Sequence, residues 1–370
     1  MKKSLLALAV LGAFAGAASA QSSVTIYGSL DLGVTKSNGG TSGNNGGQAG
    51  NVNGGIDQRK AWTLQSANAP RLGFRGNEDL GGGMSAQFQI EHRYNVDTGT
   101  QNNAGTFWQG RSYLQLSHAA AGRVFLGRDY GASFWPAVKS DPFGFDGVAQ
   151  LGTLMYGSFR SANPNTAVTR TGTTAAAAVT GLGNNVRVSN QIGYKSPSFG
   201  GLTLQIGTGL GENAVGRDDS FNVEYGAGPI YAAVAYERVK GTGSDPIATA
   251  ANSRDGDRLM SFAVHYDFGI VKPMLYFSRS QVDNVNTPVG IGDVDTDFVS
   301  LGALAPIGPG TLKAAIARLK PDLGNRTKKL GLGYDYPLSK RTNLYADVGV
   351  TKTDTLTRNT TWSFGAKHTF

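Results

Sequence analysis

The sequence has no cysteine among its 370 residues, which excludes a disulfide framework and any thiolate metal site. Charged residues make up only 16% of the chain, and there are only four histidines. After residue 20 no stretch reaches the roughly 18 consecutive apolar residues that a membrane-spanning helix requires. The hydrophobic content, 40%, is low for a soluble domain of this length with a dense core. These absences favour a fold that leaves many side chains in water.

The N-terminal segment has the pattern of a secretory signal peptide. Lys2 and Lys3 precede an apolar run from Leu5 to about Ala18, and small residues lead to Ala20. This is the order of charge, apolar region and cleavage site that export signals share. We therefore expect residues 1–20 to be removed and residues 21–370 to form one exported domain. That domain carries a formal charge of +6, because removal of the two lysines lowers the total of +8.

Alternation of apolar and polar residues runs through the whole exported part. In "GMSAQFQIEHRYN", Phe88 and Ile90 share one side while Gln89 and Glu91 share the other. A period of two is the signature of β-strands. The same pattern recurs in the segments 22–35, 185–195 and 328–337. The sequence predicts an all-β protein whose strands have one apolar and one polar face.

The connections between these strands decide between a soluble sandwich and an outer-membrane barrel. Seven short turns alternate with eight longer polar segments, including 131–184 and 281–296, which gives sixteen strands. Short turns at one end and long loops at the other are typical of bacterial outer-membrane barrels, whose apolar face meets lipid. Aromatic residues at the ends of the apolar stripes fit the interface girdles of such barrels: Tyr94, Tyr194, Tyr225, Tyr236, Tyr336 and Phe370. We expect a closed sixteen-stranded antiparallel barrel.

The last residues, "WSFGAKHTF", keep the alternation up to Phe370. The backbone N–H and C=O groups at an exposed sheet edge find no hydrogen-bond partner in lipid. The last strand of a membrane barrel must therefore be hydrogen-bonded to the first. We therefore expect the final strand to pair with the strand near residues 23–34.

Three motifs carry a family resemblance. "PRLGFRGNEDLGGGMSAQFQIEH", "FWQGRSYLQL" and "GRVFLGRDYG" occur in this order, and together the chain resembles the Gram-negative general porins, in particular the trimeric, often anion-preferring branch of beta-proteobacteria. The resemblance implies a homotrimer in outer-membrane lipid and lipopolysaccharide. It implies a water-filled channel for passive diffusion of small hydrophilic solutes and of inorganic or organic anions, with no cofactor and no nucleic-acid partner. It also implies a long third loop, here about 131–184, folded into the pore opposite a basic wall.

The place of a residue in the sequence and its parity, that is, the face of the strand on which alternation puts it, then suggest which residues line the constriction. Arg71 and Arg75 alternate with Leu72 and Phe74, which places both arginines on the lumenal side. Arg111 alternates with Ser112, Leu114 and Leu116, and Arg187 faces away from Val186, Val188 and Ile192.

Three further candidates do not follow from parity alone. Arg128 shares parity with the apolar Leu126 but stands where the third loop departs, so its direction stays open. Asp141 and Asp146 in "KSDPFGFDG" are either acidic contributors to the constriction or ordinary turn residues, because Asp-Pro and Asp-Gly favour turns.

Two other functions are compatible with a membrane barrel. A barrel hydrolase needs a histidine and a carboxylate beside a nucleophile, and only Ser261, His265 and Asp267 share a face in that way. Such a trio arises easily on an alternating strand, so we expect no catalytic residues, and no metal site. A substrate-specific channel is the second alternative. It would carry a continuous lumenal row of aromatics, whereas Tyr27, Tyr113 and Tyr231 are scattered.

Overall fold

The computed structural model describes residues 23–42, 60–66, 70–102, 106–155, 186–212, 217–240, 257–287 and 290–370. The predicted signal peptide, residues 1–20, lies outside this range, as does the segment 156–185. The strands are β1 (Ser23–Ser37), β2 (Trp62–Gln65), β3 (Arg71–Gly81), β4 (Met84–Arg93), β5 (Ser112–His118), β6 (Gly122–Tyr130), β7 (Arg187–Lys195), β8 (Leu202–Gly209), β9 (Asp218–Ala227), β10 (Ile230–Val239), β11 (Asp257–Tyr266), β12 (Lys272–Thr287), β13 (Gly290–Ile307), β14 (Gly310–Pro321), β15 (Thr327–Pro337), β16 (Thr342–Thr353) and β17 (Asn359–Thr369). Two short helices, α2 (Phe134–Lys139) and α3 (Gly152–Met155), lie between β6 and β7. No helix in these ranges is long and apolar enough to cross a membrane.

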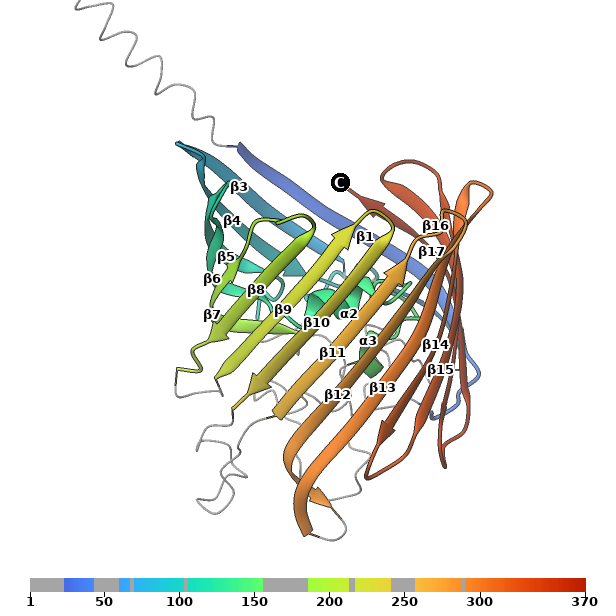
Figure 1. Ribbon diagram of the computed structural model, residues 1–370. Coiled ribbons are helices and arrows are strands. Elements are labelled where there is room, and N and C mark those ends of the chain that lie inside the picture. Colours follow the sequence, from blue (N-terminus) through green and yellow to red (C-terminus); the bar gives the residue numbers. More distant parts are fainter. Residues whose placement is uncertain are drawn as a thin grey trace, which may run out of the picture.

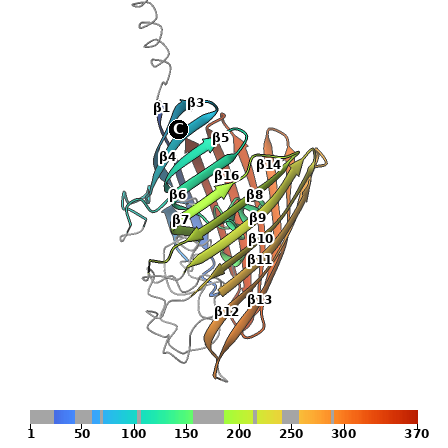
Figure 2. The ribbon, with the colours of Figure 1, turned by 60° about the vertical axis from the view of Figure 1, so that its left-hand side comes forward.

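The strands form one closed antiparallel barrel (Figures 1 and 2). β2 and β3 share one edge of β1: Ser23–Ser29 pair with β3, while Gly33–Lys36 pair with β2. The seventeen strand segments therefore occupy sixteen positions around the wall, as the sequence predicted. The opposite edge of β1 pairs with β17 from Ser29↔Thr369 to Ser37↔Thr361, which closes the barrel. The predicted pairing of the first and last strands is thus confirmed.

The apolar side chains face outward, so the barrel is inverted relative to a soluble protein. On β5, Leu114 is 54% exposed and Leu116 is 50% exposed, while Gln115 between them is 5% exposed. Buried polar residues such as Asp31, Thr35 and Ser363 line the interior. This pattern follows from a lipid-facing exterior and a wet lumen.

Two local predictions were wrong. The segment 281–296 was expected to be a loop because of its polar composition, but β12 and β13 continue through most of it and pair with each other. The segment 185–195 was expected to keep one apolar face, but Val188 is buried while Ile192 is 43% exposed. A register shift in the β6–β7 pairing and a positive φ at Asn190 turn the strand over between them. The bulge adds a residue on β7 and reverses which side faces the lumen.

The buried apolar cluster lies inside the barrel, between the wall and the chain that follows β6. Phe134, Leu151 and Met155 from this chain pack against Leu259 and Phe298 of the wall. α2 contacts β10 and β11, and α3 contacts β13, so the segment 131–155 rests on the inner face (Figure 1). The described part of the predicted third loop is therefore packed against the wall.

Candidate functional site

Four of the arginines with lumenal positions gather near the start of the third loop, and they come from β3, β4, the residue before β5, and β7. We refer to Arg71, Arg93, Arg111 and Arg187 as the arginine cluster. Arg71 and Arg93 are register partners on β3 and β4, which places two guanidinium groups side by side. Like charges at this spacing repel each other unless anions or acceptors lie between them.

Glu91 supplies one such acceptor. Arg93 Nη2 lies 2.7 Å from Glu91 Oε1, and Arg71 Nη1 lies 3.9 Å from Oε2. The hydroxyl of Tyr27 on β1 also donates to Glu91 Oε2, at 3.2 Å. Both Glu91 and Arg93 are buried, so this pair holds the base of the cluster in place.

Arg111 is fixed by a bidentate ion pair with Asp129 of β6. Its Nε and Nη2 atoms lie 2.7 Å from Oδ1 and Oδ2 respectively, a geometry that fixes the plane of the guanidinium. Arg111 Nη1 also donates to Gln89 Oε1 at 3.2 Å. The ring centroids of Tyr113, Tyr130 and Trp135 lie 4.9, 5.9 and 5.8 Å from its Cζ atom.

Tyr130 links the cluster to the third loop. Nη2 of Arg93 and Nη2 of Arg187 both donate to its hydroxyl oxygen, at 3.2 Å and 2.9 Å. Its ring stacks on Phe134 of α2 with centroids 3.8 Å apart. The arginines and the beginning of the loop are thus held by one aromatic side chain.

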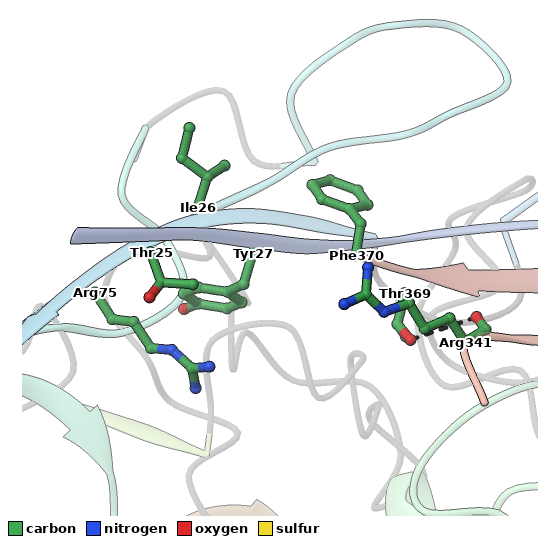
Figure 3. A pocket seen from close by; sticks show the side chains of 7 residues that line it. All are labelled: Thr25, Ile26, Tyr27, Arg75, Arg341, Thr369 and Phe370. Carbon is green, nitrogen blue, oxygen red and sulfur yellow. Dashed lines mark hydrogen bonds between the residues drawn. The ribbon is translucent and has the colours of Figure 1, made fainter. Parts of the chain in front are cut away.

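Arg75 stands apart from the cluster. Its side chain is exposed, and its Cζ atom lies 5.4 Å from the centroid of the Tyr27 ring. It lines a pocket with Arg341 and Phe370, and Figure 3 shows Ile26 on the opposite side of β1 from Tyr27 and Arg75. No ion pair of Arg75 occurs in the described part of the chain, so its charge is not offset by a carboxylate there.

Comparisons with known proteins agree with this architecture. A family model for Gram-negative porins matches residues 7–356. The chain belongs to the Gram-negative porin family. It is 32% identical to outer membrane porin protein 32 of Delftia acidovorans, over 95% of this chain and 90% of that protein. An outer membrane porin protein of Bordetella pertussis is 28% identical, over 94% of this chain and 93% of that protein. A solved anion-selective porin from Comamonas acidovorans superposes with a TM-score of 0.72 at 26% identity, covering 95% of this chain and 100% of the other.

This porin is therefore a channel of the Gram-negative outer membrane and not an enzyme. The serine, histidine and aspartate trio is used otherwise: His265 Nε2 lies 2.9 Å from the hydroxyl of Ser140, at the end of α2, and its ring stacks on Tyr231. Within the described ranges, no group of three or more histidine or acidic residues is placed to hold a metal ion.

The two loop aspartates of the porin have different environments. Asp141 is buried, and its carboxylate accepts backbone N–H bonds from Phe143, Phe145 and Leu151. Burial raises the pKa of Asp141 above its ordinary value, although the three donors oppose this. Asp146 is partly exposed, and its carboxylate lies 3.1 Å from Lys367 Nζ of β17. Asp141 thus stabilises the loop turn, while Asp146 pairs with the wall.

Arg128 lies outside the arginine cluster. Its register partner on β5 is Ser112, which shares the outward face of Leu114 and Leu116. Its Nη1 donates to Ser189 Oγ at 2.7 Å and its Nε to the carbonyl oxygen of Gln109. The structure places it on the outer side, as its parity indicated, so we leave it out of the proposed constriction.

Sequence reasoning did not single out Glu91, Asp129 or Tyr130 as site residues. Asp129 and Tyr130 lie directly after Arg128 in "GRDYG", and Glu91 stands on the polar face of β4. The lumenal positions of Asp129 and Glu91 follow from alternation, because Asp129 shares the inner face of Phe125 and Glu91 lies opposite Ile90. Their pairing with particular arginines depends on the register between strands, which a local sequence pattern does not predict.

Proposed function

We propose that this porin is a general diffusion channel for small hydrophilic solutes and ions, with a preference for anions. The observation that carries the proposal is the surplus of arginine on one side of the lumen. The arginine cluster and Arg75 contribute five cations, and Glu91 and Asp129 offset part of this charge. Fixed cations in a narrow water-filled passage raise the local concentration of anions and repel cations.

We propose that the constriction is formed by Arg71, Arg75, Arg111 and Arg187 on the wall, with Asp146 at the loop. Asp146 lies beside Lys367, so its charge is partly compensated and opposes the arginines only weakly. The similarity to a solved porin described as anion-selective supports the sign of the preference.

The zero-current potential of reconstituted channels in a potassium chloride gradient tests this proposal. The expected potential has the sign of chloride permeation. It decreases in concentrated salt, because the field of the fixed arginines is screened within about 3 Å at 1 M. A potential with the sign of potassium permeation refutes the charge assignment. Liposome swelling that stops above a certain sugar size is expected of a general channel, whereas saturable uptake of one solute would indicate a substrate-specific channel.

We also propose a homotrimer embedded in lipid and lipopolysaccharide, preceded during export by the signal peptide 1–20. On the outer face where β1 meets β17, Leu30 and Phe364 are exposed near the small residue Ala366. Exposed apolar side chains give a second barrel a surface to pack against. Cross-linking in mild detergent is expected to capture trimers, and capture of monomers alone contradicts the proposal.

A further inference from the structure

A row of small residues crosses four neighbouring strands on the inner face of the barrel. Gly302 of β13, Ala315 of β14, Gly331 of β15 and Gly349 of β16 are successive register partners. We call these four positions the small-residue row. Because neighbouring strands lie about 4.8 Å apart, the row forms a lateral groove roughly 14 Å long.

The row faces inward. Its neighbours along each strand, Leu301, Ile316 and Leu330, are between 48% and 54% exposed on the outer face. All members of the row itself are buried, although they line a lumen. Something other than the wall must therefore cover them.

The cover is the part of the third loop between residues 142 and 149, through both side-chain and backbone atoms. A Cβ atom added to Gly302 would lie 2.5 Å from Cγ of Pro142. One added to Gly331 would lie 2.7 Å from the carbonyl oxygen of Ala149, and one added to Gly349 would collide with the carbonyl oxygen of Val148. Atoms of the loop thus occupy the space in which side chains would stand at these positions.

The contact is closely packed along its length. Val148 and Ala149 are fully buried or nearly so, with 1% and 0% of their surface exposed. The same stretch is tied down by the Asp141 turn and by the Asp146–Lys367 ion pair. Packed interiors contain few voids, so even one added methyl group at the row must displace the loop or the wall.

We infer that the small-residue row is the seat of the third loop, and that its lack of side chains sets how far residues 142–149 stand into the lumen. The wall is constrained by hydrogen bonds on both sides of every member of the row, whereas Gly144, Phe145 and Asp146 of the loop keep exposed surface on the lumenal side. Added bulk therefore moves the loop inward and narrows the channel. This inference rests on the porin being a diffusion channel, and it is independent of the anion preference.

Substitution of the row tests the inference. Gly349→Ala and Gly331→Ala are expected to lower single-channel conductance and the swelling rate in the largest permeant sugar, and Gly349→Val is expected to lower both further. Gly226→Ala is the matched control. Gly226 faces inward on β9, and a Cβ atom there would meet no atom closer than Tyr231 Cδ2 at 4.0 Å. The control is expected to conduct like the unmodified porin.

Folding is checked separately through the heat-modifiable mobility of the barrel on gels. Folded row variants that conduct like the Gly226→Ala control would overturn the inference. A row variant with a wider channel would overturn it too, because that result means that the loop leaves its seat rather than moving inward. If the unmodified porin conducts no ions, the channel function itself fails, and this outcome is distinct from either result.

A cross-link provides a second test, which does not depend on whether the barrel accepts larger side chains in the small-residue row. The chain has no cysteine, so the pair Ala149→Cys and Gly331→Cys introduces the only two thiols. The Cβ atom of Ala149 lies 3.1 Å from the position of a Cβ atom on residue 331, slightly closer than the roughly 3.5–4.5 Å typical of disulfides. Mild oxidation is expected to form the disulfide with the channel still open. Failure to form it in a folded barrel would contradict the seating of the loop.

Discussion

Arg111 and Asp129 form a bidentate ion pair, with Nε–Oδ1 and Nη2–Oδ2 distances of 2.7 Å. Asp129 is buried, whereas the side chain of Arg111 retains 23% of its exposure. The carboxylate is thus hidden behind the guanidinium that it neutralises. The selectivity of the porin depends on this compensation as well as on the number of arginines.

Asp129→Asn is expected to increase the anion preference. The substitution keeps a hydrogen-bond acceptor for Arg111 but removes the negative charge, so a full positive charge remains at the lumen. The zero-current potential in a salt gradient is the measurement, and it should move further toward the chloride value. Asp219→Asn is a suitable control, because Asp219 pairs with Arg217 at 2.9 Å and shares the face of the exposed Phe221. An equal shift in both variants would contradict the prediction.

Arg75→Gln and Arg111→Gln are expected to differ in stability although both reduce the anion preference. Arg75 is exposed and lies over the ring of Tyr27, so its loss leaves no buried charge. Loss of Arg111 leaves the carboxylate of Asp129 buried without its partner, which typically costs about 3–5 kcal/mol. Thermal unfolding followed by circular dichroism separates the two variants, and the double variant should move the zero-current potential toward the non-selective value. Equal unfolding temperatures would argue against a structural role for the ion pair.

Asp141→Ala is expected to loosen the third loop while leaving the barrel folded. Three backbone N–H groups lose their acceptor, and each buried donor left unsatisfied costs about 1–3 kcal/mol. Limited proteolysis should cut the loop faster, and current through single channels should become noisier. Asp141→Asn retains one carbonyl acceptor and should lie between the alanine variant and the unmodified protein. A loop as resistant as before would show that these bonds do not hold it.

Removal of Phe370 is expected to lower the heat stability of the barrel. Gly28 N–H donates to the carbonyl oxygen of Phe370 at 3.0 Å, and Phe370 N–H donates to the carbonyl oxygen of Gly28 at 3.1 Å. Each of these bonds contributes about 0.5–1.5 kcal/mol. Phe370→Leu keeps both backbone bonds and serves as the control. The temperature at which the folded gel band disappears is the measurement, and identical values for the two variants would contradict the prediction.

The fold was predictable because its signal is local. The alternation of Leu114, Gln115 and Leu116 predicts which side chains face lipid. A period of two is a local pattern, so this prediction requires no knowledge of residues far away in the sequence. Composition was a poorer guide at the ends of strands. The segment 281–296 reads as a loop, yet polar residues such as Asp295 and Arg279 pair across the β12–β13 hairpin at 2.7 Å.

The candidate site was predictable only in part. Parity placed Arg71 and Arg111 correctly toward the lumen, but their partners follow from the register between strands. The burial of Asp141 follows from how the loop folds onto the wall, and the reversal between Val188 and Ile192 follows from one bulged residue. Such features are tertiary, so a single sequence without its structure does not contain them in readable form.

The pairing of β1 with β17 has a consequence for the order of assembly. These strands come from opposite ends of the described chain, and every strand between them is bonded only to its near neighbours in sequence. An incomplete barrel has two open edges whose backbone groups find no partner in lipid. The edges of β1 and β17 therefore satisfy each other only when both strands are present. Closure must wait for β17, which makes the last strand of the wall the one that completes the barrel.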